Sequence, residues 1–171
     1  ANTTGTRLTA LGLSAALPNT TGGSNPAVGS QALRSNQTGE SNVAVGENSM
    51  YYNTGSYNVA VGRQALLSNT TASNNTAVGY QAGYSNTTGA ANTAVGNKAG
   101  HSITTGSGNI AIGDQALETI STGNQNVAIG QYAMESKTGA SGSNVAIGFA
   151  SQVSGGESDN NTSVGASSLR F

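Results

Sequence analysis

The chain has 171 residues, no cysteine and a formal net charge of −1, and only 8% of its residues are charged. This composition excludes a disulfide framework, and it offers no basic stripe that could neutralise the phosphates of a nucleic acid. No run of about 18 apolar residues occurs, so the sequence contains no candidate membrane-spanning segment.

The sequence repeats from end to end with a period close to 17 residues, and each unit closes on an apolar residue followed by glycine. One interval between successive glycines is 16 residues and one is 18. A repeat of this kind indicates stacked units that bury their apolar faces against one another. We therefore predict one all-β domain over residues 1–171, a parallel β-solenoid of ten coils. The glycines that mark the coils are Gly12, Gly29, Gly46, Gly62, Gly79, Gly96, Gly113, Gly130, Gly148 and Gly165.

Each unit contains a five-residue stretch of the type Asn-x-Ala-Val-Gly, which is predicted to be a β-strand. In chain order these stretches are 8–12, 25–29, 42–46, 58–62, 75–79, 92–96, 109–113, 126–130, 144–148 and 161–165. Residues two apart share a face of a strand, so one face carries mainly Val, Ile and Thr and the other carries Asn, Ala and Gly. None of the stretches contains a charged residue, which is typical of a strand buried on both faces. We expect one face to fill the coil and the other to meet a second chain, so that Ala94→Glu should break the assembly or prevent folding.

An asparagine opens nine of the ten strands, and Leu8 replaces it in the first. Stacked amides one coil apart can bond to each other and to the backbone, so a structural ladder of asparagines is predicted. Its members are Asn25, Asn42, Asn58, Asn75, Asn92, Asn109, Asn126, Asn144 and Asn161.

A second wall of the coil is predicted a few residues after each glycine. Alanine or serine stands three residues after the glycine, and a large apolar residue often follows, as in Ala65 and Leu66. We interpret this stretch as a second short strand. The turn that follows is rich in Ser, Asn, Thr and Gly, which bond their own backbone or tolerate positive φ.

The units Asn75–Gly89 and Asn144–Gly148 resemble the head repeats of trimeric autotransporter adhesins and related phage tail-fibre shafts. The resemblance covers essentially the whole chain, although the repeat here is longer than the adhesin head repeat. It implies a left-handed parallel β-roll, commonly with three chains side by side, at a cell or virion surface.

Catalytic, metal and cofactor sites are not expected. His101 is the only histidine, and other units hold Arg34, Glu118 or Glu135 at its position, which indicates an exposed surface residue. The serines have no partnered base in the sequence pattern, and the Asp residues stand alone. We therefore expect a protein that is not an enzyme and needs no cofactor.

Tyrosines that could bind sugars and asparagines that could be glycosylated are two surface features of the sequence. Tyrosine rings could stack on sugar rings, although packing at the edge of the solenoid is the alternative interpretation. The tyrosines considered for this surface are Tyr51, Tyr52, Tyr80, Tyr84 and Tyr132. Asn-x-Ser/Thr sites such as Asn36 and Asn86 could accept glycans, but turn chemistry also accounts for them.

The sequence thus predicts a structural protein that forms the shaft or repeating subunit of an extracellular fibre or filament, with an adhesive purpose. The alternative is a glycan- or receptor-binding head of a surface adhesin or tail fibre. The expected partners are copies of itself, as a lateral trimer or a head-to-tail filament, and a host-surface glycan or receptor, with no nucleic acid and no membrane insertion. End-to-end contacts are predicted through Leu8, Leu11, Leu169 and Phe171.

Overall fold

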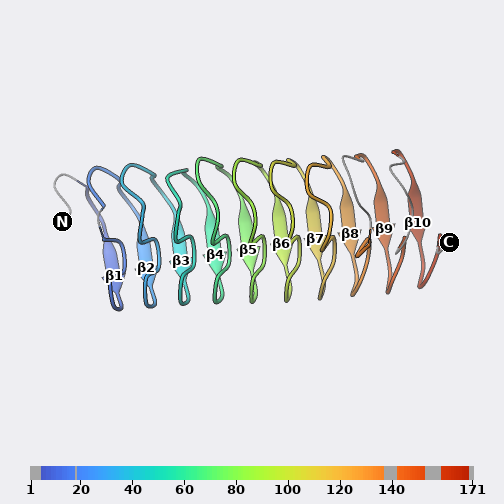
Figure 1. Ribbon diagram of the computed structural model, residues 1–171, viewed down its shortest axis with the longest axis horizontal. Coiled ribbons are helices and arrows are strands. Elements are labelled where there is room, and N and C mark those ends of the chain that lie inside the picture. Colours follow the sequence, from blue (N-terminus) through green and yellow to red (C-terminus); the bar gives the residue numbers. More distant parts are fainter. Residues whose placement is uncertain (1–4, 18, 137–141, 153–158, 170–171) are drawn as a thin grey trace.

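The protein is a rod of stacked coils built around one ten-stranded parallel sheet (Figure 1). The computed structural model describes residues 5–17, 19–136, 142–152 and 159–169. Each strand has three residues, and the strands follow one another along the rod in sequence order. Their bounds are β1 Thr9–Leu11, β2 Pro26–Val28, β3 Val43–Val45, β4 Val59–Val61, β5 Thr76–Val78, β6 Thr93–Val95, β7 Ile110–Ile112, β8 Val127–Ile129, β9 Val145–Ile147 and β10 Thr162–Val164.

The register places each residue beside its equivalent one coil away. Ala77 pairs with Ala94 and Val78 with Val95, and the same pattern holds along the sheet. The described residues contain no helix, and so none that could cross a membrane. These observations confirm the predicted parallel β-solenoid, whereas its left-handed winding stays a prediction.

Only one strand per coil forms in the described residues, so the prediction of a second strand after the glycine was wrong. The second and fourth residues after the glycine lie in the left-handed region, as at Gln31 (φ 56) and Leu33 (φ 53). Left-handed residues at every second position prevent an extended chain, yet this segment still bonds to the next coil, from Leu33 N to Ser49 O at 2.9 Å. It also turns two adjacent side chains inward, because Ala32 and Leu33 are both fully buried. A regular strand would send them to opposite faces.

The interior of each coil is narrow and is filled by small residues from the strand and larger ones from the opposite wall. The central alanine of the strand is buried from β2 to β9, whereas Ala10 of β1 is exposed, and Leu, Met or Ile side chains belong to the same core cluster as the buried alanines. The Asn-Ala face therefore fills the coil, and the Val/Ile face points outward. Ala94 is 4% exposed inside the coil, so Ala94→Glu would act on folding rather than on an interface.

The asparagines that precede the strands form a continuous buried column. Asn109 shows the repeating arrangement: its Oδ1 accepts hydrogen bonds from the backbone N and the Nδ2 of Asn126 at 3.0 and 3.1 Å. Its Nδ2 donates to the backbone oxygen of Gly123 at 2.8 Å, in the turn that leads into the next strand. Each side chain therefore links one coil to the next and ties the strand to the turn. Asn161, in the last coil, is partly exposed.

A second buried column of asparagines runs through the turns, where the sequence pattern predicted only turn chemistry. Asn36 Nδ2 donates to Asn19 Oδ1 at 3.3 Å and to Gly39 O at 2.9 Å, and Asn86 Nδ2 donates to Asn69 Oδ1 at 2.8 Å. Ile103 and Ile120 occupy the same position in the next two coils. Its members are Asn19, Asn36, Asn53, Asn69 and Asn86. Because these side chains are buried, the Asn-x-Thr sites among them cannot carry glycans in the folded protein.

Candidate functional surfaces

The outer face of the sheet carries two in-register ranks of mostly β-branched side chains along the rod. Val45, Val61 and Val78 are 36–37% exposed, and Leu11 and Val164, on the first and last strands, are each 67% exposed. The first rank is Thr9, Pro26, Val43, Val59, Thr76, Thr93, Ile110, Val127, Val145 and Thr162, and the second is Leu11, Val28, Val45, Val61, Val78, Val95, Ile112, Ile129, Ile147 and Val164. No charged residue interrupts either rank. The result is an uncharged, mostly apolar surface that repeats along the rod, and these two rows are called the Val/Ile ranks below.

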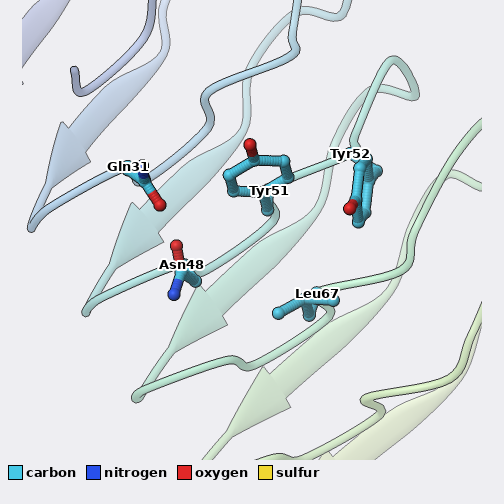
Figure 2. A pocket seen from close by; sticks show the side chains of 5 residues that line it. All are labelled: Gln31, Asn48, Tyr51, Tyr52 and Leu67. Carbon is cyan, nitrogen blue, oxygen red and sulfur yellow. The ribbon is translucent and has the colours of Figure 1, made fainter.

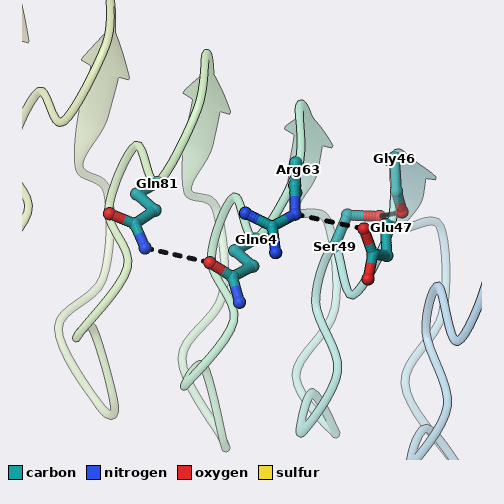
Figure 3. Close-up of polar contacts among 6 residues, drawn as sticks. All are labelled: Gly46, Glu47, Ser49, Arg63, Gln64 and Gln81. Carbon is teal, nitrogen blue, oxygen red and sulfur yellow. Dashed lines mark hydrogen bonds and ion pairs between the residues drawn. The ribbon is translucent and has the colours of Figure 1, made fainter.

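Beyond the strand, polar side chains of successive coils bond to one another along the rod (Figure 3). Arg63 Nε lies 3.1 Å from Glu47 Oε2, and Gln81 Nε2 donates to Gln64 Oε1 at 2.9 Å. The hydrogen bond that Arg63 donates to the Glu47 carboxylate is the largest cause that raises the pKa of Arg63 above its ordinary value. Both partners of this ion pair are half exposed, so the pair contributes little to stability. These contacts are side-chain ladders that match one coil to the next.

The five tyrosines proposed as a ligand surface do not form one patch. Tyr84 stacks on His101, with ring centroids 5.1 Å apart and planes at 3°. Tyr80 lies under the guanidinium of Arg63, and Tyr132 meets Phe149 edge to face at 6.1 Å. For these three, packing against side chains of adjacent coils is what the structure shows.

Tyr51 and Tyr52 are brought together, with ring centroids 4.6 Å apart and planes at 69°. They border a surface hollow of about 260 Å³, and Figure 2 shows the side chains around it. The other lining residues are Gln31, Asn48 and Leu67, so three successive coils contribute. Among the tyrosine positions in the described chain, this pair has the geometry of a candidate binding site.

His101 lies beside the rod's polar ladders rather than in a catalytic arrangement. Burial lowers its pKa below the ordinary value of 6.5, with Lys98 acting in the same direction and Glu118 opposing it. Its Nδ1 is 3.5 Å from Ser102 Oγ, which is too long for a hydrogen bond that would activate a nucleophile. The described residues contain no group of three His, Cys, Asp or Glu side chains that could hold a metal ion.

The first coil, which holds Leu8 and Leu11, and the last coil, which holds Leu169, lie at opposite ends of the rod (Figure 1). Leu8 packs against the core, whereas Leu11 is 67% exposed on the outer strand face. Leu169, in the last coil, is 37% exposed, and Phe171 lies outside the described residues. Contact between Leu169 of one chain and Leu8 or Leu11 of another stays a prediction.

Comparisons of the chain with protein-family models, with curated proteins and with solved structures gave no match.

Proposed function

We propose that the protein is a non-enzymatic structural subunit that associates laterally with copies of itself through the outer face of its sheet, forming an extracellular fibre. The observation that carries this proposal is the pair of uncharged, partly exposed Val/Ile ranks along the sheet. Apolar side chains that project together from a flat surface favour association, because contact removes them from water.

A second copy is the partner that fits this surface best. The side chains of the outer sheet face form ridges that repeat at the strand spacing of about 4.8 Å. Only a surface with the same period can fit into the grooves between these ridges along the whole rod. Another chain of the same sequence has that period by construction. The absence of charge on the two ranks also means that like charges would not oppose the pairing.

Three chains around a common axis would be the arrangement implied by the resemblance to trimeric adhesin heads and tail-fibre shafts. A location at a cell or virion surface and an adhesive purpose follow from the same resemblance. The nearly neutral composition agrees with this proposal, because it provides no electrostatic attraction for nucleic acid. A head-to-tail filament would be a further level of assembly.

Sedimentation velocity over a range of protein concentrations tests the proposal. The wild-type chain should sediment as an oligomer, whereas Val78→Lys should sediment as a folded monomer, because each copy would have to bury an unpaired ammonium. The matched control is Gln81→Lys, which places the same charge where the next coil naturally has Lys98. This control should leave the oligomer intact. A wild-type monomer at all concentrations, or an oligomer unaffected by Val78→Lys, would refute lateral association.

A further inference from the structure

We propose that the hollow between Tyr51, Tyr52 and Asn48 is a binding site for a neutral saccharide. The site lies among side chains that follow the strands, away from the Val/Ile ranks, so it goes beyond the proposed lateral association and does not depend on it.

The hollow arises where a column of glutamines is interrupted. Gln31, Gln64 and Gln81 occupy the second position after the glycine in their coils, and Asn48 stands between Gln31 and Gln64. The asparagine side chain is one methylene shorter. Gln64, moreover, is hydrogen bonded to Gln81 on its other side, at 2.9 Å. The shorter side chain of Asn48 therefore leaves a space, and Figure 2 shows this space bordered by Gln31, Asn48 and Tyr51.

The rings of Tyr51 and Tyr52 form the apolar part of the lining, and their planes face in different directions. Tyr52 is 51% exposed and stands in a column where Ser35 and Ser68 are its equivalents one coil away. Tyr51 is held in place because Arg34 Nη1 donates to its hydroxyl at 2.8 Å and the guanidinium lies 5.8 Å from the ring centroid. Rings set at 69° to each other can contact two sides of a small ligand. The C–H face of a pyranose is apolar and suits such a wall.

The polar groups at the hollow suit hydroxyl groups. The amides of Gln31 and Asn48 each provide a donor and an acceptor. Asn48 Oδ1 is buried and has no hydrogen-bond partner in the protein, so the amide gains one if it rotates to bring this oxygen to a ligand hydroxyl. A few convergent polar groups beside aromatic side chains are the usual composition of a ligand pocket.

The size and charge of the hollow define the ligand class. A volume of about 260 Å³ is below the usual range for drug-sized ligands, so the ligand we propose is one sugar unit of a larger chain. None of the five lining residues is charged, and the nearby Arg34 is already bonded to Tyr51. The site therefore favours a neutral sugar over a sialic or uronic acid.

Binding can be tested with D-glucose, D-galactose, D-mannose and N-acetyl-D-glucosamine, each titrated by saturation-transfer NMR, and with sialic acid as the anionic comparison. At least one neutral sugar should bind. Tyr52→Ser and Asn48→Gln, which install the residues of neighbouring coils, should weaken that binding by at least about tenfold. The control is Tyr57→Ser: Tyr57 is 61% exposed, lies outside the hollow, and has Ser41 as its equivalent one coil earlier.

The proposal would be overturned if no neutral sugar bound, if sialic acid alone bound, or if Tyr57→Ser weakened binding as much as Tyr52→Ser. Circular dichroism spectra of all variants should match that of the wild type, which separates loss of the site from loss of the fold. Titrating the Val78→Lys monomer separates this proposal from the proposed function. Retained binding there would support the site whatever the outcome for lateral association, and loss of binding in a folded monomer would overturn the site as described.

Discussion

Ala77 and Val78 are adjacent in the chain but belong to different environments: Ala77 is fully buried inside the coil, and Val78 is 36% exposed on the outer face of β5. Ala77 packs within a cluster of small side chains, with the neighbouring alanines of the sheet on either side. One residue of separation therefore distinguishes the surface that stabilises a single chain from the surface proposed to join chains.

The first prediction follows from this pair. Ala77→Lys should prevent folding, because its ammonium would enter a core that offers no counter-charge and no room. Val78→Lys should leave the fold intact. Circular dichroism and urea denaturation of the two variants measure the difference. If Ala77→Lys folded with wild-type stability, the assignment of the alanine face to the interior would be wrong.

The second prediction concerns the glycine column that closes the strands. A Cβ added to Gly148, where φ is 129°, would lie 2.6 Å from the backbone oxygen of Gly165 in the next coil. A Cβ on Gly165, where φ is 118°, would meet nothing within 4 Å. Gly148→Ala should thus destabilise by about 3 kcal/mol or more, from backbone strain together with the clash. Gly165→Ala should cost only the strain, about 1–3 kcal/mol.

Thermal denaturation of these two variants side by side provides the measurement. Equal losses would mean that strain alone requires glycine and that the close approach of successive coils contributes nothing.

The third prediction couples two core positions in one coil. Ile103 Cδ1 would lie 3.0 Å from a Cβ on Gly100, so isoleucine fills the space that Leu33 or Leu66 fills in other coils. Gly100→Leu alone should overpack the coil, and Ile103→Asn alone should leave a cavity. The double variant restores the Leu/Asn pairing seen at Leu66 and Asn69, so its destabilisation should be smaller than the sum by at least about 1 kcal/mol. Additive losses in a urea-denaturation cycle would contradict this coupling.

The repeat period and the alternation of apolar residues were enough to predict the sheet, because each strand residue pairs with its equivalent in the next coil. The pattern could not decide which face of the strand is internal. Valine suits either a core or a pleated outer surface, and only the narrowness of the coil, closed by left-handed residues such as Gln64 and Leu66, selects alanine for the interior. Non-glycine residues at positive φ are uncommon, so sequence favoured a second strand there.

The candidate site was visible only in part. Tyr51 and Tyr52 were singled out by residue type, but Asn48 and Gln31 were not, since an amide on an exposed turn carries no distinctive signal. A comparison of equivalent positions could have found it, because Asn48 is one methylene shorter than the glutamines of its column. The second asparagine column was missed for a related reason: Asn in a Ser-Asn-Thr-Thr-Gly segment is typical of a turn, and its burial depends on how the coil closes.

The last prediction concerns pH. Burial holds the pKa of His101 below 6.5, so the unfolded chain binds a proton at this residue more readily than the folded chain does. The contribution of neutral His101 to the free energy of unfolding is therefore fully present above pH 6.5. It is lost as the pH falls below that value towards the lower pKa of the folded state. His101 is the only histidine in the sequence. The melting temperature of the wild type should therefore fall between pH 7.5 and 5.5.

His101→Phe is the control, because phenylalanine keeps an aromatic ring against Tyr84 but does not titrate. Its melting temperature should change less over the same interval. Glu118 is the group that opposes the shift, since its charge favours protonated His101 and thereby raises the pKa. Glu118→Gln should consequently steepen the loss of stability on acidification. Identical pH profiles for the wild type, His101→Phe and Glu118→Gln would show that His101 is not linked to folding, and that its stacking on Tyr84 is insensitive to charge.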